Sequence, residues 1–464
     1  MQYQEQIHAW VEAHQDEMVA DLAALIGIRS VQGKTQENAP FGEEPAKALA
    51  YMLEKCGSYG FSTDNADWYA GSATLGNAPE KLGILAHLDV VPEGDGWLHD
   101  PFTLTEDGDM LYGRGTSDDK GPAVAALYAM RAVKDLGIPL KDSVRLIFGT
   151  NEENGSGDLA YYMQHRTMPP LVFTPDGEYP VINLEKGMIR LRLDAEFTDG
   201  KSKVVSLKAG GAVNAVPATA EAVVCGVSID TFLATRVKEY PGTVIAAHED
   251  EQGLLHIHVG GKNAHASAPE LGKNALTLLL ELLSLLPLPG EQGKTIRRLA
   301  ELYPYGETDG SAPGIAASDE LSGALTLLLS VMELNETSMT AWNDIRFPVC
   351  CEGKALVAAM QEALAPVSVM DVLCDAPHHT DEKSDFVQAL LRVYENVTGE
   401  PGKCLAIGGG TYVHHIEGGV AFGSVFPGVD IHMHGAEEYI RKSHLLLDAE
   451  MMALAITEIC GADV

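Results

Sequence analysis

Short apolar runs alternate with amphipathic segments between about residues 80 and 180 of the chain. The segment PAVAALYAMRAVKDLG (residues 122–137) has apolar residues at helical spacing and ends at Gly137, as helices commonly do. Alternating strands and helices are typical of an α/β layer with a largely parallel sheet. The predicted strands of this layer are KLGILAHLDVV (81–91), DSVRLIFGT (142–150) and PLVFTPD (170–176).

From about residue 184 to residue 377 the pattern changes to apolar and polar residues that alternate along short segments, which is typical of strands with one exposed face. FVQALLRVYENVTG (386–399) then returns to helical spacing. We therefore predict a discontinuous α/β domain of residues 1–185 and 378–464 and an inserted α+β domain of residues 186–377. The inserted segments are GMIRLRLDAEF (187–197), LLHIHVGG (254–261), the helical NALTLLLELLSLL (274–286) and NDIRFPV (343–349).

The first 25 residues predict one amphipathic helix and not a secretory signal, because no basic segment is followed by an apolar one. No apolar run reaches the length that a membrane-spanning helix needs. A cytoplasmic location is the expectation.

Composition narrows the possible partners. The chain of 464 residues has 66 acidic and 32 basic residues and a net charge of −34, which argues against nucleic acid or an anionic membrane as the main partner. The 7 cysteines are odd in number and lack CxxC spacing. We therefore expect neither a disulfide framework nor a thiolate zinc site.

Acidic residues and histidines follow the predicted strands and open the predicted helix. Binding sites of open α/β sheets collect at the carboxyl ends of the strands, where these residues fall. Imidazoles, a carboxylate that can bridge and further carboxylates form the mixed N/O ligand set that holds a pair of divalent cations for hydrolysis. The candidates are His87, Asp89, Asp118, Glu152, Glu153, Asp176 and His434.

His87 and Asp89 lie two residues apart, a spacing that points side chains to the same face of a strand. Asp89 could then accept a hydrogen bond from the ring nitrogen of His87 that is not bound to metal. Asp118 is the candidate bridge, whereas Asp119 could be a solvated acid at the start of the helix. A histidine–aspartate pair without catalytic meaning is the alternative for the first two residues.

Glu152 and Glu153 are adjacent, so their side chains face different directions. We assign Glu152 as the general base that holds the metal-bound water and Glu153 as a ligand, with a solvated acidic loop as the alternative. Asp176 ends an apolar strand, and His434 has His432 as a near competitor. The doublets His378/His379 and His414/His415 lack acids at ligand-like spacing.

These motifs together resemble the M20 metallopeptidases, and within them the PepV-type bacterial dipeptidases, over essentially the full length. The resemblance implies a di-metal catalytic domain with an inserted α+β lid. It implies one cation held by His87, Asp118 and Asp176, and another by Asp118, Glu153 and His434. It also implies Glu152 as the base, Asp89 behind the first histidine and a cis Asp118–Asp119 peptide. The motifs are HLDVVP, GRGTSDDKGP, the Glu–Glu pair, TPDGEYP, GGKNAHASAPELGKNA and FPGxxxxMH.

The same resemblance implies further residues around the substrate. His265 matches a lid residue that stabilises the oxyanion. Asn214 and Arg346 match lid positions that grip the substrate, Arg346 through a carboxylate that its guanidinium can bind bidentately. The glycine loop implies substrate contacts by Gly409, Gly410 and Thr411.

The expected function is therefore metal-dependent hydrolysis of short peptides, mainly dipeptides, with two divalent cations per chain. Zn²⁺ suits the ligands, and Mn²⁺ or Co²⁺ would also fit. Deacylation of N-acyl or N-succinyl amino acids by the same machinery is the alternative, and a catalytically silent binding protein is a rival from another class. The long inserted domain resembles the enlarged lids of PepV-type enzymes, and this resemblance implies a monomer.

Overall fold

A computed structural model describes residues 1–236 and 238–462 of the chain. The chain divides into two compact units. Unit 1 comprises Met1–Leu184, His379–Leu405 and the described part of Gly410–Val464, and unit 2 comprises Glu185–His378 and Ala406–Gly409.

The short segment Ala406–Gly409 differs from the sequence expectation, which placed it with the residues of unit 1. Its backbone is bound by residues of unit 2. The amide of Lys186 donates to the carbonyl of Ile407 at 2.9 Å, and a guanidinium N–H of Arg346 donates to the carbonyl of Gly408 at 2.9 Å. These contacts join residues more than 60 positions apart, so no local pattern could have indicated them.

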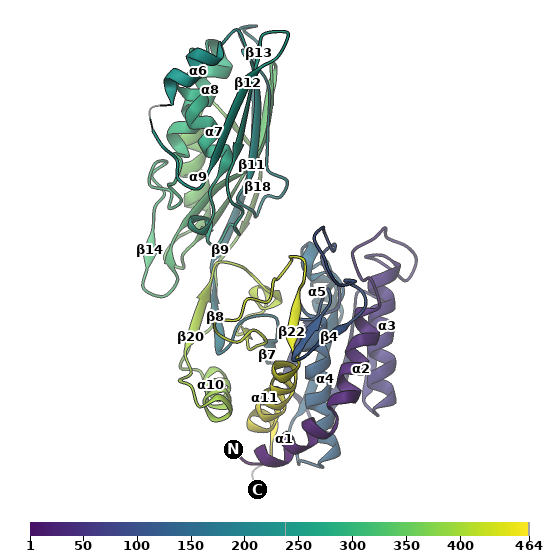
Figure 1. Cartoon of the computed structure of the whole chain (residues 1–464). Helices are drawn as coiled ribbons and strands as arrows, with labels where there is room; N and C mark the ends of the chain where they lie inside the picture. Colours follow the sequence, from purple (N-terminus) through teal and green to yellow (C-terminus); the bar gives the residue numbers. More distant parts are fainter. Residues whose placement is uncertain (237, 463–464) are drawn as a thin grey trace. The chain divides into compact units, whose positions relative to one another are not determined.

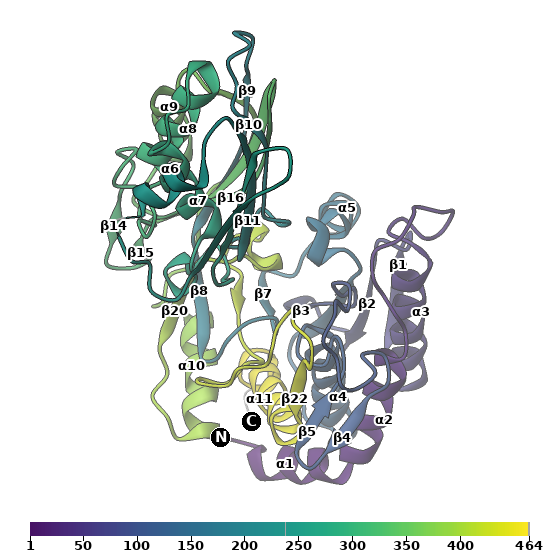
Figure 2. The same ribbon diagram turned by 45° about the horizontal axis from the view of Figure 1, so that its top comes forward.

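Unit 1 is built around a mixed nine-stranded sheet (Figures 1 and 2). Its central strands run in the order β6, β3, β7, β21, with parallel pairing between neighbours, whereas β1–β2, β2–β6 and β21–β8 are antiparallel. The α/β expectation is confirmed, and its parallel part is the centre of the sheet. The strands are β1 (Ser62–Ala66), β2 (Ala70–Leu75), β3 (Glu80–His87), β6 (Ser143–Gly149), β7 (Leu171–Thr174), β8 (Val181–Glu185), β19 (His378–His379), β20 (Cys404–Ile407) and β21 (Val420–Ala421).

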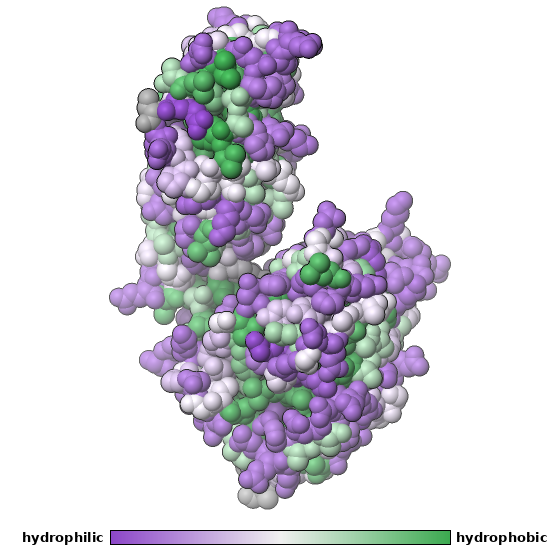
Figure 3. Space-filling view, viewed as in Figure 1, coloured by the Kyte–Doolittle hydropathy of each residue, from purple (hydrophilic) through white to green (hydrophobic). Residues whose placement is uncertain are grey.

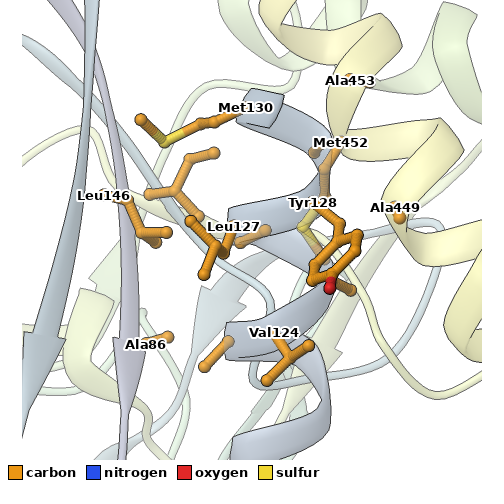
Figure 4. Packing of buried hydrophobic residues seen from close by; sticks show 14 of the residues in the cluster. Ala86, Val124, Leu127, Tyr128, Met130, Leu146, Ala449, Met452 and Ala453 are labelled. Atoms are coloured by element: carbon orange, nitrogen blue, oxygen red, sulfur yellow. The ribbon is translucent and has the colours of Figure 1, made fainter. Parts of the chain in front are cut away.

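Helices α4 (Lys120–Asp135) and α11 (Lys442–Cys460) pack against each other and against the sheet. Figure 4 shows side chains of α4 between Ala86 and Leu146 of the strands on one side and Ala449 and Ala453 of α11 on the other. Residues 120–133 of α4 are all buried, because neighbours cover the helix on every face. This central helix begins two residues after Asp118, the predicted bridging aspartate, so the core fixes the position of that residue.

The N-terminal segment forms two helices, where the sequence predicted one. Helix α1 (Gln4–Ala13) ends at His14, and α2 (Gln15–Ile26) starts at the next residue. The ring of His14 stacks on Trp10 at 3.8 Å, and its Nδ1 lies 2.7 Å from the carbonyl oxygen of Trp10. The contact between the His14 ring and the Trp10 carbonyl supports the end of the first helix. The apolar periodicity of the sequence continues across this break, so it could not indicate two helices.

The remaining elements of unit 1 include a small antiparallel sheet of β4, β5 and β22. They are α3 (Glu43–Ser58), β4 (Thr105–Asp107), β5 (Met110–Tyr112), η1 (Glu152–Asn154), α5 (Gly157–His165), α10 (Asp385–Thr398), η3 (Tyr412–His415) and β22 (Tyr439–Arg441).

Unit 2 has an antiparallel eight-stranded sheet in the order β12-β13-β11-β10-β16-β17-β9-β18. Its helices gather on one face (Figures 1 and 2), and burial alternates along β9 and β13, as expected for strands with one covered face. The elements are β9 (Gly187–Glu196), β10 (Val204–Ala209), β11 (Thr219–Cys225), α6 (Ile229–Thr235), β12 (Val244–Glu249), β13 (Leu254–Gly260), η2 (Pro269–Leu271), α7 (Ala275–Ser284), α8 (Gly290–Leu302), β14 (Ser318–Asp319), β15 (Gly323–Ala324), β16 (Thr326–Asn335), β17 (Ser338–Phe347), α9 (Gly353–Leu364) and β18 (Ser368–Asp375).

The visible surface of both units is mostly hydrophilic, with scattered hydrophobic patches (Figure 3). This distribution agrees with the excess of acidic residues. Among the described helices, none combines the length and the apolar character needed to cross a membrane.

Candidate metal centre

Asp118 lies between two histidines that are far apart in the sequence. Its Oδ1 is 2.9 Å from Nε2 of His87, and its Oδ2 is 2.9 Å from Nε2 of His434. The residue sits in the turn before α4, and its peptide bond to Asp119 is cis, the geometry that the family resemblance implied. Because each carboxylate oxygen faces a different imidazole, this side chain has the arrangement of a ligand that bridges two cations.

Two further acids flank this axis. Oδ2 of Asp176 lies 3.7 Å from Nε2 of His87, and Oε2 of Glu153 lies 3.3 Å from Nε2 of His434. The five predicted ligands thus fall into two groups that share Asp118. His87 also has ligand atoms of Glu152 and Asp176 close by, all within 4.8 Å of one another.

The sheet explains why these residues meet. Strands β3, β6 and β7 are parallel, so their carboxyl ends lie at one edge. β3 ends at His87, the acidic helix η1 follows the end of β6, and Asp176 follows β7 by two residues. Each strand therefore delivers one part of the ligand set.

Asp89 holds the acidic pair in place. Its two carboxylate oxygens accept the backbone N–H groups of Glu152, at 3.1 Å, and Glu153, at 3.2 Å. Nδ1 of His87 lies 2.9 Å from the main-chain oxygen of Asp89 and 3.6 Å from its carboxylate. The sequence predicted the carboxylate as the partner of this ring nitrogen, whereas the main-chain oxygen lies closer and the carboxylate stands at ion-pair distance. The difference arises because β3 ends at His87, so the alternation of a strand does not extend to Asp89.

The main-chain contact also defines the tautomer of His87. A carbonyl oxygen can only accept a hydrogen bond, so Nδ1 carries a proton. Nε2, which donates to Asp118, is then the ring nitrogen that would bind a cation once its own proton is lost. A metal-binding histidine needs this arrangement.

Burial dominates the electrostatics of the acids. It raises the pKa of Glu152 well above its ordinary value and that of Asp176 to about 7, and neighbouring carboxylates add to both shifts. Burial also acts on Asp118, but hydrogen bonds from His434 and His87 outweigh it and hold the pKa of Asp118 far below its usual range. The site therefore concentrates negative charge away from water, which a bound cation would neutralise.

One oxygen of the cluster supports the fit of a metal. Oε1 of Glu153 is buried and has no hydrogen-bond partner among the described residues. A buried carboxylate oxygen is unfavourable without a partner, and a divalent cation would supply one. Histidine and carboxylate ligands together suit Zn²⁺, Mn²⁺ or Co²⁺.

Residues 83–458 match the model of peptidase family M20/M25/M40. The chain belongs to this family. It is 34% identical over 464 residues to the Beta-Ala-Xaa dipeptidase of Lactobacillus delbrueckii subsp. lactis, with 97% of each chain covered. It is also 34% identical to YtjP of Bacillus subtilis (strain 168), covering 96% of this chain and 97% of that one. The structure of human carnosine dipeptidase 1 has a TM-score of 0.63 at 16% identity over 99% of both chains, a likeness of fold alone.

Asp119 is a residue of this M20 chain whose environment differs from the sequence expectation. The sequence left it open as a solvated acid, but the structure buries it completely. Its Oδ2 accepts the backbone N–H of His87 at 3.0 Å. Burial, with the charge of Asp176, raises the pKa of Asp119 well above its ordinary value. The adjacent aspartates thus have separate tasks, one facing the histidine rings and the other holding the end of β3.

The competing histidines lie elsewhere. Nδ1 of His432 is 3.1 Å from the carbonyl oxygen of Glu437, and its ring contacts Tyr439. His434 is distinguished by its distances, because its Nε2 lies 2.9 Å from Asp118 and 3.3 Å from Glu153.

Sequence reasoning missed a second buried network of the M20 site, beneath the acidic turn. The carboxylate of Asp158 accepts the backbone N–H groups of Thr150, at 2.5 Å, and Asn151, at 2.8 Å, together with the hydroxyl of Tyr412. A methyl group added at Gly149 would overlap both side chains, so glycine is needed there. The turn that leads to Glu152 is therefore held from below, and the only sequence signal was the glycine at the end of a strand.

Two predicted substrate residues are neighbours within unit 2. The N–H of Ala266 donates to the carbonyl of Asn214 at 2.8 Å, and Ala215 pairs with His265 in an antiparallel bridge. The N–H of Ser267 donates to Nδ1 of His265 at 3.3 Å, and the Ser267 hydroxyl lies 2.7 Å from the same atom. Since Nδ1 accepts, the neutral ring carries its proton on Nε2, where it can donate.

Arg346 is only 5% exposed, and its guanidinium already has partners. Nε and Nη2 bind the carboxylate of Asp344 at 2.5 and 3.1 Å, and Nη1 donates to Gly408. The family resemblance implied that this fork binds a substrate carboxylate. Asp344 occupies it because residues two apart on β17 point to the same face.

The glycine loop divides between the two units. Gly409 belongs to unit 2, whereas Gly410 and Thr411 belong to unit 1. The hydroxyl of Thr411 accepts the N–H of Val413 at 3.4 Å and caps η3. Substrate contacts by these three residues stay a prediction.

Proposed function

We propose that this chain is a two-metal dipeptidase that hydrolyses the peptide bond of short peptides, mainly dipeptides. The observation that carries the proposal is the carboxylate of Asp118 with one oxygen toward His87 and the other toward His434. Membership of the M20 family and the similarity to the Beta-Ala-Xaa dipeptidase support it.

His87, Asp118 and Asp176 would hold one cation, and Asp118, Glu153 and His434 would hold the other. Two divalent cations, when bound, acidify a water molecule and polarise the scissile carbonyl. We infer Zn²⁺ as the metal, with Mn²⁺ or Co²⁺ as alternatives, because histidine nitrogen and carboxylate oxygen are the ligands on offer.

Glu152 would act as the general base. Its backbone is fixed by Asp89, and its carboxylate lies within 4.8 Å of ligand atoms of His87 and Asp176. The burial that raises its pKa favours acceptance of a proton from the nucleophilic water. Glu152 would then return that proton to the leaving amine.

His265, Asn214 and Arg346 would bind substrate from unit 2. His265 has its proton on Nε2, which suits donation to an oxyanion. Nε and Nη2 of Arg346 are engaged by Asp344, so a substrate carboxylate would meet the remaining N–H groups of Nη1 and Nη2. A short free peptide, a monomeric enzyme and a cytoplasmic location complete the proposal.

Deacylation of N-acyl or N-succinyl amino acids is the competing function, because the metal centre alone would serve both reactions. A matched panel separates them: a free dipeptide, its N-acetylated form, an N-succinyl amino acid and a tripeptide, each with chelated protein reloaded with Zn²⁺ or Mn²⁺. We expect cleavage of the free dipeptide. Preference for the acylated compounds would replace the dipeptidase proposal with the deacylase.

Glu152→Gln tests the mechanism separately from the substrate. The variant keeps the size of the side chain and its backbone contact with Asp89, so we expect unchanged metal content. Loss of the base should lower kcat by about 10²- to 10⁴-fold. Undiminished turnover with both cations bound would reject Glu152 as the base.

A further inference from the structure

Glu438 connects the loop of Asp118 with the loop of His434. Its side chain is fully buried, and its Oε1 accepts three backbone N–H groups. These belong to Gly115 at 3.0 Å, Ser117 at 3.0 Å and Asp118 at 3.3 Å. The backbone of the candidate bridging residue is therefore attached directly to a residue four positions beyond His434.

Arg114 completes this connection from the other side. Its Nη1 binds Oε2 of Glu438 at 2.5 Å, and its Nη2 donates to the carbonyls of Gly435, at 2.8 Å, and Glu93, at 3.3 Å. The guanidinium lies over the ring of Trp97, 5.3 Å from its centroid, and the side chain is 1% exposed. Arg114 thus holds both ends of the segment 435–438.

His434 depends on this support. Its side chain is 48% exposed, and its backbone has a φ of 60°, a conformation that non-glycine residues adopt rarely. Surrounding contacts must therefore hold the residue in place. The adjacent segment 435–438 is anchored by Arg114 and Glu438.

We propose that Arg114 and Glu438 are positioning residues of the metal centre, which hold the His434 loop against the Asp118 turn so that one cation can be shared between them. This inference rests on the proposed two-metal function. Stability alone explains the pair poorly, because hydrophobic residues of similar volume often stabilise a protein as well as a buried ion pair does. The three N–H bonds to one carboxylate oxygen instead define the geometry of the turn.

Zn²⁺ binding by the full-length chelated protein tests the proposal, with affinities from competition against a chromophoric chelator. Glu438→Gln places an amide N–H₂ group beside Arg114 or beside the three backbone N–H groups, so it breaks one side of the connection. We expect binding of the cation held by His434 to weaken about 10- to 100-fold, the usual effect of losing a partner that orients metal ligands. Circular dichroism and the thermal transition of the metal-free variant would show that it is folded.

Glu437→Gln is the matched control. Glu437 is the neighbouring residue, but its carboxylate binds the backbone N–H of Leu98 at 2.6 Å and the ring of His99 at 2.7 Å. Among the described residues, the Glu437 carboxylate has no hydrogen bond or ion pair with the Asp118 turn. We therefore expect the Zn²⁺ affinity of this variant to stay within about threefold of wild type, the range for loss of a partly exposed ion pair. An equal loss in both variants would overturn the specific role of Glu438.

Arg114→Lys keeps the positive charge and removes the forked guanidinium that joins Glu438 to Gly435. This variant tests the proposal if Glu438→Gln does not fold. We expect about tenfold weaker Zn²⁺ binding. A folded Glu438→Gln or Arg114→Lys protein that binds two Zn²⁺ with wild-type affinity would overturn the inference. Wild-type protein that does not bind two Zn²⁺ would instead reject the proposed function on which the inference rests.

Discussion

The hydroxyl of Tyr412 should stabilise the turn that leads to Glu152, and the size of this stabilisation should depend on pH. Tyr412 and Asp158 are both fully buried. Burial, with the nearby charge of Asp89, raises the pKa of Asp158 to about 6 from an ordinary value of 3.8, whereas the Tyr412 hydrogen bond lowers it. Tyr412→Phe removes that hydrogen bond and keeps the ring.

The sign follows from the protonation of Asp158. Its folded pKa is above its unfolded value, so the folded state takes up a proton between about pH 4 and pH 6, and the ionised group opposes folding above that range. The difference between 3.8 and about 6 corresponds to about 3 kcal/mol at pH 8. The Tyr412 hydroxyl offsets part of this penalty, because it binds the ionised carboxylate of Asp158 more strongly than the protonated one.

The expected loss is therefore larger at high pH. A hydrogen bond to a charged group contributes about 1.5–3 kcal/mol, and one between neutral groups about 0.5–1.5 kcal/mol. Since backbone N–H groups of Thr150, Asn151 and Leu159 still bind Asp158, we expect a loss of about 2 kcal/mol at pH 8. At pH 5, where Asp158 is protonated, we expect about 1 kcal/mol.

Urea unfolding of metal-free protein at pH 5 and pH 8 measures this difference. Trp342 is the tryptophan of unit 2, so a Trp342→Phe background lets fluorescence report on unit 1 alone. Tyr162→Phe is the control, because Tyr162 is buried in the same cluster and its hydroxyl binds Arg145 at 3.3 Å. The loss of stability caused by Tyr162→Phe should be equal at both pH values. Equal losses for Tyr412→Phe at the two pH values, or a larger loss at pH 5, would refute the reasoning.

Two other substitutions test the centre and its candidate oxyanion residue. Asp118→Asn replaces one of two carboxylate oxygens that each lie 2.9 Å from a histidine. Metal analysis after dialysis should find at most one tightly bound cation, and activity assays should find no turnover. Retention of two cations would reject Asp118 as the bridging ligand. Ser267→Ala removes the hydroxyl beside Nδ1 of His265, and since one hydrogen bond contributes about 0.5–1.5 kcal/mol, we expect kcat to fall about two- to tenfold with KM unchanged. A change in KM alone would point to a role in substrate binding.

Local patterns predicted the elements near the site because these depend on neighbours in the sequence. The helix after the aspartate pair runs from Lys120 to Asp135, close to its predicted end at Gly137, which adopts a positive φ of 64°. The apolar strands before His87 and Asp176 were predicted for the same reason. Where a side-chain contact ends an element, as His14 does between α1 and α2, periodicity could not show the break.

The sequence by itself determined the chemistry that this chain can offer, because the types of the ligand residues and their places at strand ends are local properties. Only the tertiary structure decided which oxygen of Asp118 faces which histidine, that the carboxylate of Asp89 binds the acidic turn and that Asp119 is buried. It also placed Glu438 on the turn of Asp118, more than 300 residues away. These outcomes depend on contacts between distant segments, whose geometry is set by packing of the whole unit.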